Sequence, residues 1–215
     1  GLRIIRFDKR GHGLSTCPPA PYSMGSLITD TEKLLDHLGV KDCVFVGLSI
    51  GGMVAQGLAR KRLDLIRAMV LSNTAAKIAT QDIWQDRIAS IRKDGIGPVS
   101  DATMQRWFSP EMHGTPAMAP WANMLRATRA EGYIGCAQAV SGTDFITATS
   151  ALRLPLIWIG IVTVSSTSMA GSATGQGALT IRPDPPKSAQ ISSDRCGVIG
   201  DMSCASARAA CRLAS

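Results

Sequence analysis

The sequence lacks an apolar run long enough to cross a bilayer. The longest candidate, residues 154–164, contains a proline and falls short of the roughly eighteen residues that a membrane-spanning helix needs. The first residues also lack the charged-then-apolar pattern of a secretory signal. We therefore expect a cytoplasmic protein without a membrane partner.

Metal-binding and nucleic-acid-binding patterns are absent as well. The six cysteines lie far apart and include no Cys-x-x-Cys pair, so neither a zinc site nor a disulfide framework is indicated. The net charge of +7 is spread along the chain, and the basic runs 60–62 and 92–93 have no aromatic residues interleaved with them. We predict no cofactor and no nucleic-acid partner, whereas a diffuse positive charge suits a small anionic substrate. The sequence does not indicate an oligomeric state.

Large core-forming residues and titratable residues become scarce toward the C-terminus. No phenylalanine or tyrosine follows Phe145, no glutamate follows Glu131, and no histidine follows His113. A low-complexity segment with few large apolar residues does not build a packed core. We therefore expect residues 163–215 to form a disordered tail, and the abrupt change of composition is typical of a shift in reading frame.

One stretch carries clear chemistry. The apolar run 44–46 leads into Gly47-Leu48-Ser49-Ile50-Gly51, and a helical pattern follows. This is the strand–turn–helix context of a nucleophile elbow, in which small residues two before and two after the serine avoid a collision. Gly-x-Ser-x-Gly alone is a weak signal, but this context predicts Ser49 as a nucleophile and the Ile50 N–H as an oxyanion donor.

The elements around this elbow alternate in type. Residues 2–73 read as strand, helix, strand, helix and strand, with Ser26 as the expected cap of the first helix, and this order predicts a parallel sheet. Strand signals vanish from 74 to 148, where four helices are predicted, and return at 156–161. The predicted fold class is α/β. Its parts are a partial core (1–73), a helical cap (74–148), a resumed core strand (149–162) and the tail (163–215).

Several segments together resemble the 3-oxoadipate enol-lactonases, α/β-hydrolases of the β-ketoadipate pathway. They are the elbow, Asn73-Thr74-Ala75-Ala76, Arg106-Trp107-Phe108 and Glu131-Gly132-Tyr133, and the likeness covers about residues 1–158. The resemblance implies hydrolysis of 3-oxoadipate enol-lactone to 3-oxoadipate in aromatic catabolism. Another ester or lactone hydrolase, or a cofactor-free haloperoxidase-like relative, remains an alternative because all of them use the same elbow. A catalytically inactive fragment that binds a small acid is the third reading.

The resemblance also implies a substrate-binding set formed by Trp84, Arg87 and Trp107. Arginine suits the free carboxylate of the lactone because its planar fork can bind both oxygens. For Trp107, packing within the cap is the alternative role.

The same resemblance implies opening strands before Gly1, and an acid and a histidine base after Ile159. The sequence supplies none of them, so we expect impaired activity. His12 precedes the elbow, whereas the base of these enzymes follows it, and we interpret His12 as a loop residue.

Overall fold

The computed structural model describes residues 1–160 and 196–200, which group into two compact units. The sheet unit comprises residues 1–7, 32–76 and those described from 145 onward, and the helical unit comprises residues 8–31 and 77–144. Helix α1 (Met24–His37) begins in the helical unit and ends in the sheet unit.

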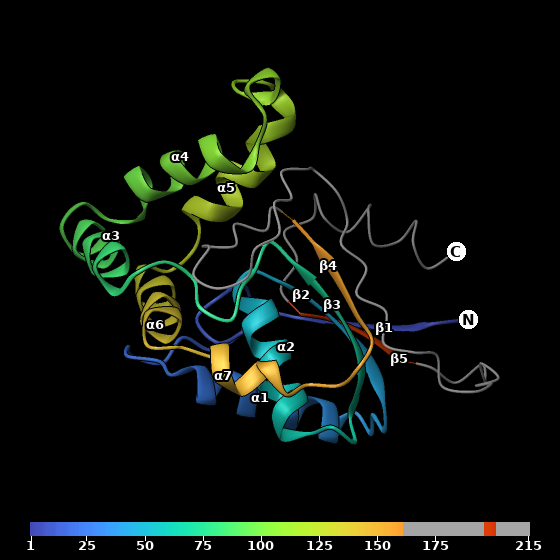
Figure 1. Cartoon of the computed structure of the whole chain (residues 1–215). Helices are drawn as coiled ribbons and strands as arrows, with labels where there is room; N and C mark the ends of the chain where they lie inside the picture. The colour runs from blue at the N-terminus through green and yellow to red at the C-terminus, as the bar shows by residue number, and fades with distance from the viewer. Residues whose placement is uncertain (161–195, 201–215) are drawn as a thin grey trace, which may run out of the picture. The chain divides into compact units, whose positions relative to one another are not determined.

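The sheet unit is built on a parallel sheet with the strand order β1-β5-β2-β3-β4 (Figure 1). The strands are β1 (Arg3–Phe7), β2 (Cys43–Leu48), β3 (Ile66–Ser72), β4 (Leu156–Ile159) and β5 (Cys196–Gly200). Helix α2 (Ile50–Lys61) packs against β2 and β3, and the short helix α7 (Ile146–Ser150), which we did not predict, contacts α2. The predicted fold class, an α/β fold with a parallel sheet, is confirmed.

Strand β2 lies inside the sheet, with β5 on one side and β3 on the other. Cys43 and Phe45 are fully buried, as are Met53 and Leu58 of α2. Burial of a large apolar side chain stabilises a fold by about 1.5–3 kcal/mol, so these residues anchor the strand and the helix on either side of Ser49.

The prediction of a tail without regular structure is wrong at Cys196–Gly200. These residues form β5, which pairs in parallel with both neighbours, so that Val198 lies opposite Ile5 on β1 and opposite Phe45 on β2. Parallel pairing uses backbone N–H and C=O groups, which every residue of Cys-Gly-Val-Ile-Gly carries. A search for large apolar residues therefore missed the strand. The rest of the predicted tail lies outside the described residues.

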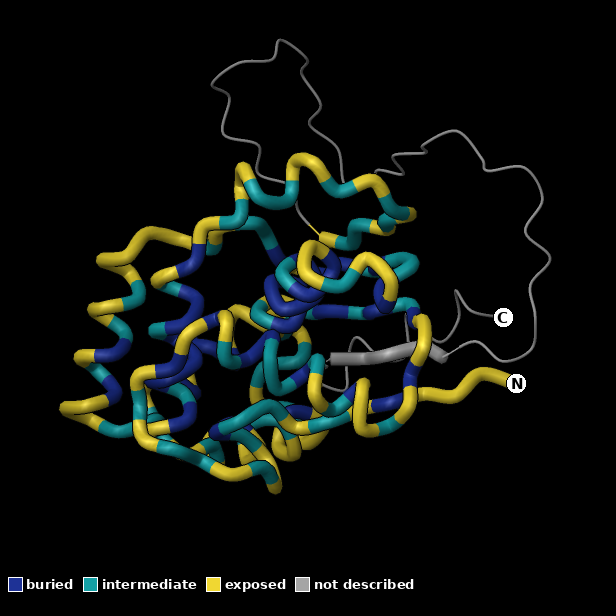
Figure 2. The backbone as a smooth tube through the Cα atoms, turned by 90° about the horizontal axis from the view of Figure 1, so that it is seen from below, coloured by how far each residue is buried: buried dark blue, intermediate teal, exposed yellow. Residues whose placement is uncertain are grey.

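Besides the start of α1, the helical unit contains four α-helices and two short 3-10 helices. They are α3 (Gln81–Asp94), α4 (Ile96–Trp107), η1 (Pro110–Met112), η2 (Pro116–Met118), α5 (Ala119–Arg126) and α6 (Ala130–Ser141). Helices α3 and α6 share an apolar cluster, and a second cluster joins α4, η2 and α5. In Figure 2, buried and exposed positions alternate along the helices, as expected for helices that pack through one face.

Residues 8–31 belong to the helical unit, although we predicted them as part of the core 1–73. Gly11 and Gly132 of α6 approach so closely that a Cβ on either glycine would collide with the backbone of the other. Arg129 Nη2 donates to Ser15 O at 2.5 Å. Such contacts between segments more than a hundred residues apart leave no periodic signal in the sequence, which explains the error.

Helix α1 begins earlier than predicted. Ser23, not Ser26, acts as the cap, because Ser23 Oγ accepts a hydrogen bond from the Ser26 N–H at 3.1 Å. At the other end, Gly39 has φ 67°, a left-handed conformation that terminates helices.

Candidate active site

Ser49 lies at the turn between β2 and α2, with φ 52° and ψ −116°. A positive φ in a residue other than glycine is uncommon and strained. The turn is tight, because a Cβ on Gly47 would lie 2.5 Å from Gly51 O. The structure therefore shows the predicted collision that makes glycine necessary at position 47.

Ile50 is the first residue of α2. The first N–H groups of an α-helix have no intrahelical acceptor, and the positive end of the helix dipole lies beside them. The Ile50 N–H thus has the features of the oxyanion donor that we predicted.

The described part of the chain gives the Ser49 hydroxyl no hydrogen-bonded base. His37 is exposed at the end of α1. In the helical unit, His12 Nδ1 lies 3.4 Å from Arg10 O and 3.9 Å from Cys136 Sγ. His113 Nε2 lies 2.9 Å from Phe108 O, so a backbone carbonyl holds its ring.

Trp84 and Arg87 are brought together on α3, one helical turn apart. The Arg87 guanidinium lies 5.0 Å from the centre of the Trp84 ring, and Arg87 Nη1 donates to Tyr133 Oη at 3.5 Å. Trp84 Nε1 in turn donates to Ile78 O at 2.7 Å, which fixes the indole. No carboxylate among the described residues pairs with Arg87, so neutral groups hold its guanidinium.

Trp107 is the last residue of α4 and is 49% exposed. Its side chain makes no ring contact or hydrogen bond within the described residues. The neighbouring Phe108 packs instead, with its ring centre 6.3 Å from that of Trp121. A substrate-binding role for Trp107 stays a prediction.

Sequence reasoning missed two residues that contact the candidate residues, one in each unit. Tyr133 holds Arg87 from α6, and Thr74 donates from its hydroxyl to Ser49 O at 2.6 Å. Both lie in segments that carried the resemblance, Glu131-Gly132-Tyr133 and Asn73-Thr74-Ala75-Ala76. That was the available signal, although it did not assign either side chain a role.

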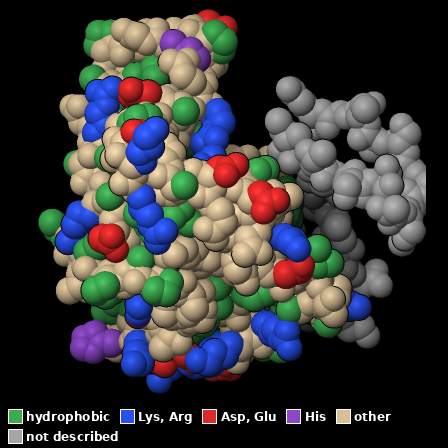
Figure 3. Space-filling view, turned by 90° about the vertical axis from the view of Figure 1, so that its left-hand side faces the viewer, with side chains coloured by type: hydrophobic (Ala, Val, Ile, Leu, Met, Phe, Trp, Pro, Cys, Tyr) green, Lys and Arg blue, Asp and Glu red, His purple; other side chains and the backbone are tan. Residues whose placement is uncertain are grey.

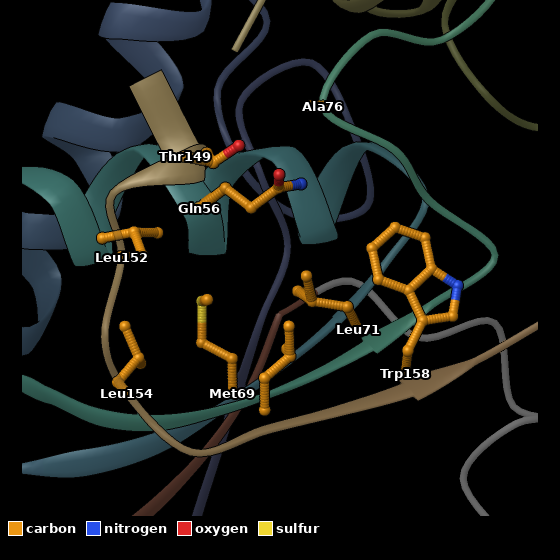
Figure 4. A pocket seen from close by; sticks show the side chains of 9 residues that line it. Gln56, Met69, Leu71, Ala76, Thr149, Leu152, Leu154 and Trp158 are labelled. Carbon is orange, nitrogen blue, oxygen red and sulfur yellow. The ribbon is translucent and has the colours of Figure 1, made fainter. Parts of the chain in front are cut away.

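A hollow of about 200 Å³ lies in the sheet unit beside α2 (Figure 4). Gln56 forms its polar wall, and its Nε2 donates to Gly52 O at 3.1 Å and to Ala75 O at 3.3 Å. The remaining lining is mostly apolar, formed by Met69, Leu71, Ala76, Thr149, Leu152, Leu154, Leu156 and Trp158. No cationic side chain lines it, so it does not suit an anionic substrate.

Charge does not single out another site on the face of the molecule that Figure 3 shows. On the face shown in Figure 3, acidic side chains lie among basic ones. The described residues contain no cluster of three or more His, Cys, Asp or Glu that could hold a metal ion. Within the same residues, no helix combines the length and hydrophobicity of a membrane span.

The fold and the elbow define the class: the chain has the α/β-hydrolase fold. The family model for the alpha/beta hydrolase fold matches residues 1–97. At the level of particular proteins, the chain is similar to 3-oxoadipate enol-lactonase 2 of Acinetobacter baylyi, with 34% identity over 158 residues. Enol-lactonase 1 of the same organism is 27% identical over 159 residues. Each alignment covers 73% of this chain and 59% of the relative, so the chain spans about three fifths of their length.

Solved structures agree with this result. The enol-lactonase from Burkholderia xenovorans LB400 superposes with a TM-score of 0.68 and 32% identity, over 70% of this chain and 59% of that one. A hydrolase from Pseudomonas aeruginosa PA01 gives a TM-score of 0.67 and 34% identity, over 70% and 58%. The resemblance to enol-lactonases predicted from the sequence is confirmed.

Proposed function

We propose that this chain carries the nucleophile of a serine hydrolase that opens 3-oxoadipate enol-lactone or a closely related lactone. The observation that supports the proposal most is the strained backbone of Ser49, held between β2 and the first turn of α2. Strain of this kind is kept where it serves a function, and here it exposes a hydroxyl beside a helix N-terminus. The β-ketoadipate pathway and the cytoplasmic location belong to the same proposal.

The chemistry follows from the substrate, a cyclic ester whose leaving group is an enol. Ser49 Oγ attacks the carbonyl carbon, and the Ile50 N–H stabilises the negative charge that develops on the carbonyl oxygen. The ester C–O bond then breaks, the ring opens, and water releases the acid from the acyl-enzyme. Both attacks need a base to remove a proton.

No described residue acts as that base through a hydrogen bond to Ser49. Removing the base from such a triad lowers turnover by about 10⁴ to 10⁶. We therefore expect low turnover from this chain, which keeps the catalytically inactive reading open.

In the helical unit, we propose Arg87 as the residue that binds the carboxylate of the lactone. Trp84 and Tyr133 hold the guanidinium without neutralising it. A guanidinium kept free of protein carboxylates is suited to bind a substrate carboxylate through two hydrogen bonds.

A fluorophosphonate probe and a lactone ring-opening assay test the nucleophile. We expect the unchanged chain to be labelled once, and slowly because no described base activates Ser49, Ser49→Ala to lose the label, and a control at half-buried Ser26, Ser26→Ala, to keep it. Labelling that survives Ser49→Ala would remove Ser49 from its role. A chain that shows neither labelling nor ring opening supports the inactive fragment.

A further inference from the structure

Both backbone groups of Ser49 are held from the end of the neighbouring strand β3. The Ser49 N–H donates to Ser72 O at 2.9 Å. The Ser49 carbonyl accepts a 2.6 Å hydrogen bond from Thr74 Oγ1. Gly52 N, at 2.9 Å, and Met53 N, at 3.2 Å, also donate to this carbonyl, but they belong to the turn itself. Thr74 thus reaches the turn with its side chain from the segment that follows β3.

The surroundings of Thr74 hold its side chain in one orientation. The preceding residue, Asn73, has φ 43°, and its N–H donates to Ile159 O of β4 at 2.8 Å. The Thr74 side chain fills the space beside Gly52, where an added Cβ would lie 2.8 Å from Thr74 Oγ1. Thr74 is only 9% exposed, so neighbouring atoms restrict its rotamer.

The hydrogen bond acts on the group that stabilises the oxyanion. Ser49 C=O and Ile50 N–H belong to the same planar trans peptide unit and point in opposite directions. A donor that fixes the direction of Ser49 O therefore also fixes the direction of the Ile50 N–H. Strained backbone conformations persist only where the surroundings determine them in this way.

We propose that Thr74 is a positioning residue that sets the orientation of the Ser49–Ile50 peptide and so aims the oxyanion donor. The structural part of this proposal stands on the contacts alone, and its chemical consequence rests on the proposed function. The hydroxyl of Thr74 carries the effect, while its methyl group serves packing.

The test uses the full chain with Thr74→Val, which keeps the shape and removes the hydroxyl, and Thr74→Ser, which keeps the hydroxyl. Thr143→Val is the matched control, because Thr143 Oγ1 also donates to a backbone carbonyl, Ala139 O, at 2.6 Å from a buried position. Amide hydrogen exchange at Ser49, Gly52 and Met53, whose N–H groups are hydrogen-bonded at the turn, is measured by NMR for each variant. A typical hydrogen bond corresponds to about a tenfold change in local opening.

We expect exchange at these three amides to become about tenfold faster in Thr74→Val, to stay near the unchanged value in Thr74→Ser, and to be unaffected by Thr143→Val. Unchanged exchange in a folded Thr74→Val chain would overturn the proposal. If Thr74→Val does not fold, Thr74→Ala and Thr74→Ser form the second pair, since both lack the methyl group and differ in the hydroxyl. Equal exchange in that pair also overturns it.

The chemical consequence has its own readout, the rate of Ser49 labelling by the fluorophosphonate. We expect about tenfold slower labelling in Thr74→Val and recovery in Thr74→Ser. Faster exchange with unchanged labelling would refute the link to the oxyanion donor. If the unchanged chain is not labelled at all, the proposed function fails, while the exchange comparison still decides whether Thr74 positions the peptide.

Discussion

The two units hold their candidate residues in different ways. In the sheet unit, Ser49 is fixed through its backbone, by a strained turn and by hydrogen bonds from the end of the next strand. In the helical unit, Arg87 is fixed through its side chain, by an indole below it and a phenol beside it. The proposed nucleophile therefore depends on main-chain geometry, whereas the proposed anion-binding residue depends on the identity of its neighbours.

This difference predicts where each unit tolerates change. Gly47 at the elbow has no substitute, because backbone atoms of Gly51 and Gly52 occupy the space that a side chain would need. Surface positions of the helices can change freely as long as the few side chains around Arg87 are kept. The predictions below test this contrast.

The largest effect is expected from Gly47→Ala. Its new Cβ would lie 2.5 Å from Gly51 O and 2.6 Å from Gly52 N, so the elbow must shift. We expect the free energy of unfolding to fall by at least about 3 kcal/mol, measured by urea denaturation.

The matched control for this change is Gly97→Ala in α4. Apart from its chain neighbours, a Cβ at Gly97 meets nothing within 4 Å, so we expect the free energy of unfolding to change by no more than about 1 kcal/mol. Similar small changes at both positions would show that the elbow is less constrained than the contrast requires.

The same contrast explains what could be predicted from the sequence. The elbow was predictable because its geometry requires glycine at Gly47, and that requirement appears within a few neighbouring residues. The contact of Arg87 with Tyr133, 46 positions away, carries no local pattern. Strand β5 escaped prediction because pairing between strands demands little of the side chains.

Substitution of Arg87 tests the part of the comparison that concerns side-chain contacts in the helical unit. We expect Arg87→Ala to weaken binding of a small dicarboxylate such as adipate by about 10- to 100-fold, because a charge-assisted hydrogen-bond pair is lost. Titration calorimetry measures the dissociation constant, with Arg92→Ala, at an exposed position of the same helix, as the control. Equal affinity in the two variants would exclude Arg87 as the carboxylate ligand.

Residues 8–31 pack against α6 through Tyr22. We expect this contact to make a smaller contribution to stability, and one that depends on pH. Tyr22 is 5% exposed, packs against Gly135 and donates to Pro18 O at 2.6 Å. Burial is the main reason why the pKa of Tyr22 is raised to about 12. The folded chain therefore keeps this proton at a pH at which the unfolded chain, with a tyrosine pKa near 10, has released it.

Stability should accordingly fall as the pH rises from about 10 to 12, and Tyr22→Phe should lack this part of the fall. The expected difference in slope is about 1.4 kcal/mol per pH unit, and it reaches roughly 2–3 kcal/mol at the upper end. Denaturation at pH 8, 10 and 11 measures it. If the free energy of unfolding falls with pH equally in the two proteins, the Tyr22 phenol is not protected from water.

The sheet unit also has side-chain contacts, at the C-terminal end of α2. Glu32 of α1 accepts hydrogen bonds from Lys61 and, at 3.4 Å, from Arg62 Nη1. Arg62 also pairs with Asp36 at 3.2 Å and with Asp64 at 2.9 Å. These contacts are largely at the surface, where ion pairs contribute little.

The variant Glu32→Gln measures how much these ion pairs contribute to the stability of the sheet unit. The hydrogen bond from Lys61 is the main cause that lowers the pKa of Glu32. A carboxyl group with a lowered folded-state pKa contributes stability above its unfolded pKa, near 4.3, and loses it as the pH falls through the folded value. We expect Glu32→Gln to cost less than about 1 kcal/mol at pH 7 and nothing at pH 2–3, measured by urea denaturation.

The control is Asp101→Asn, which breaks an exposed 2.6 Å ion pair with Arg126 in the helical unit. A loss at Glu32 as large as that from Gly47→Ala would mean that side chains, and not the strand backbone, hold the sheet unit together.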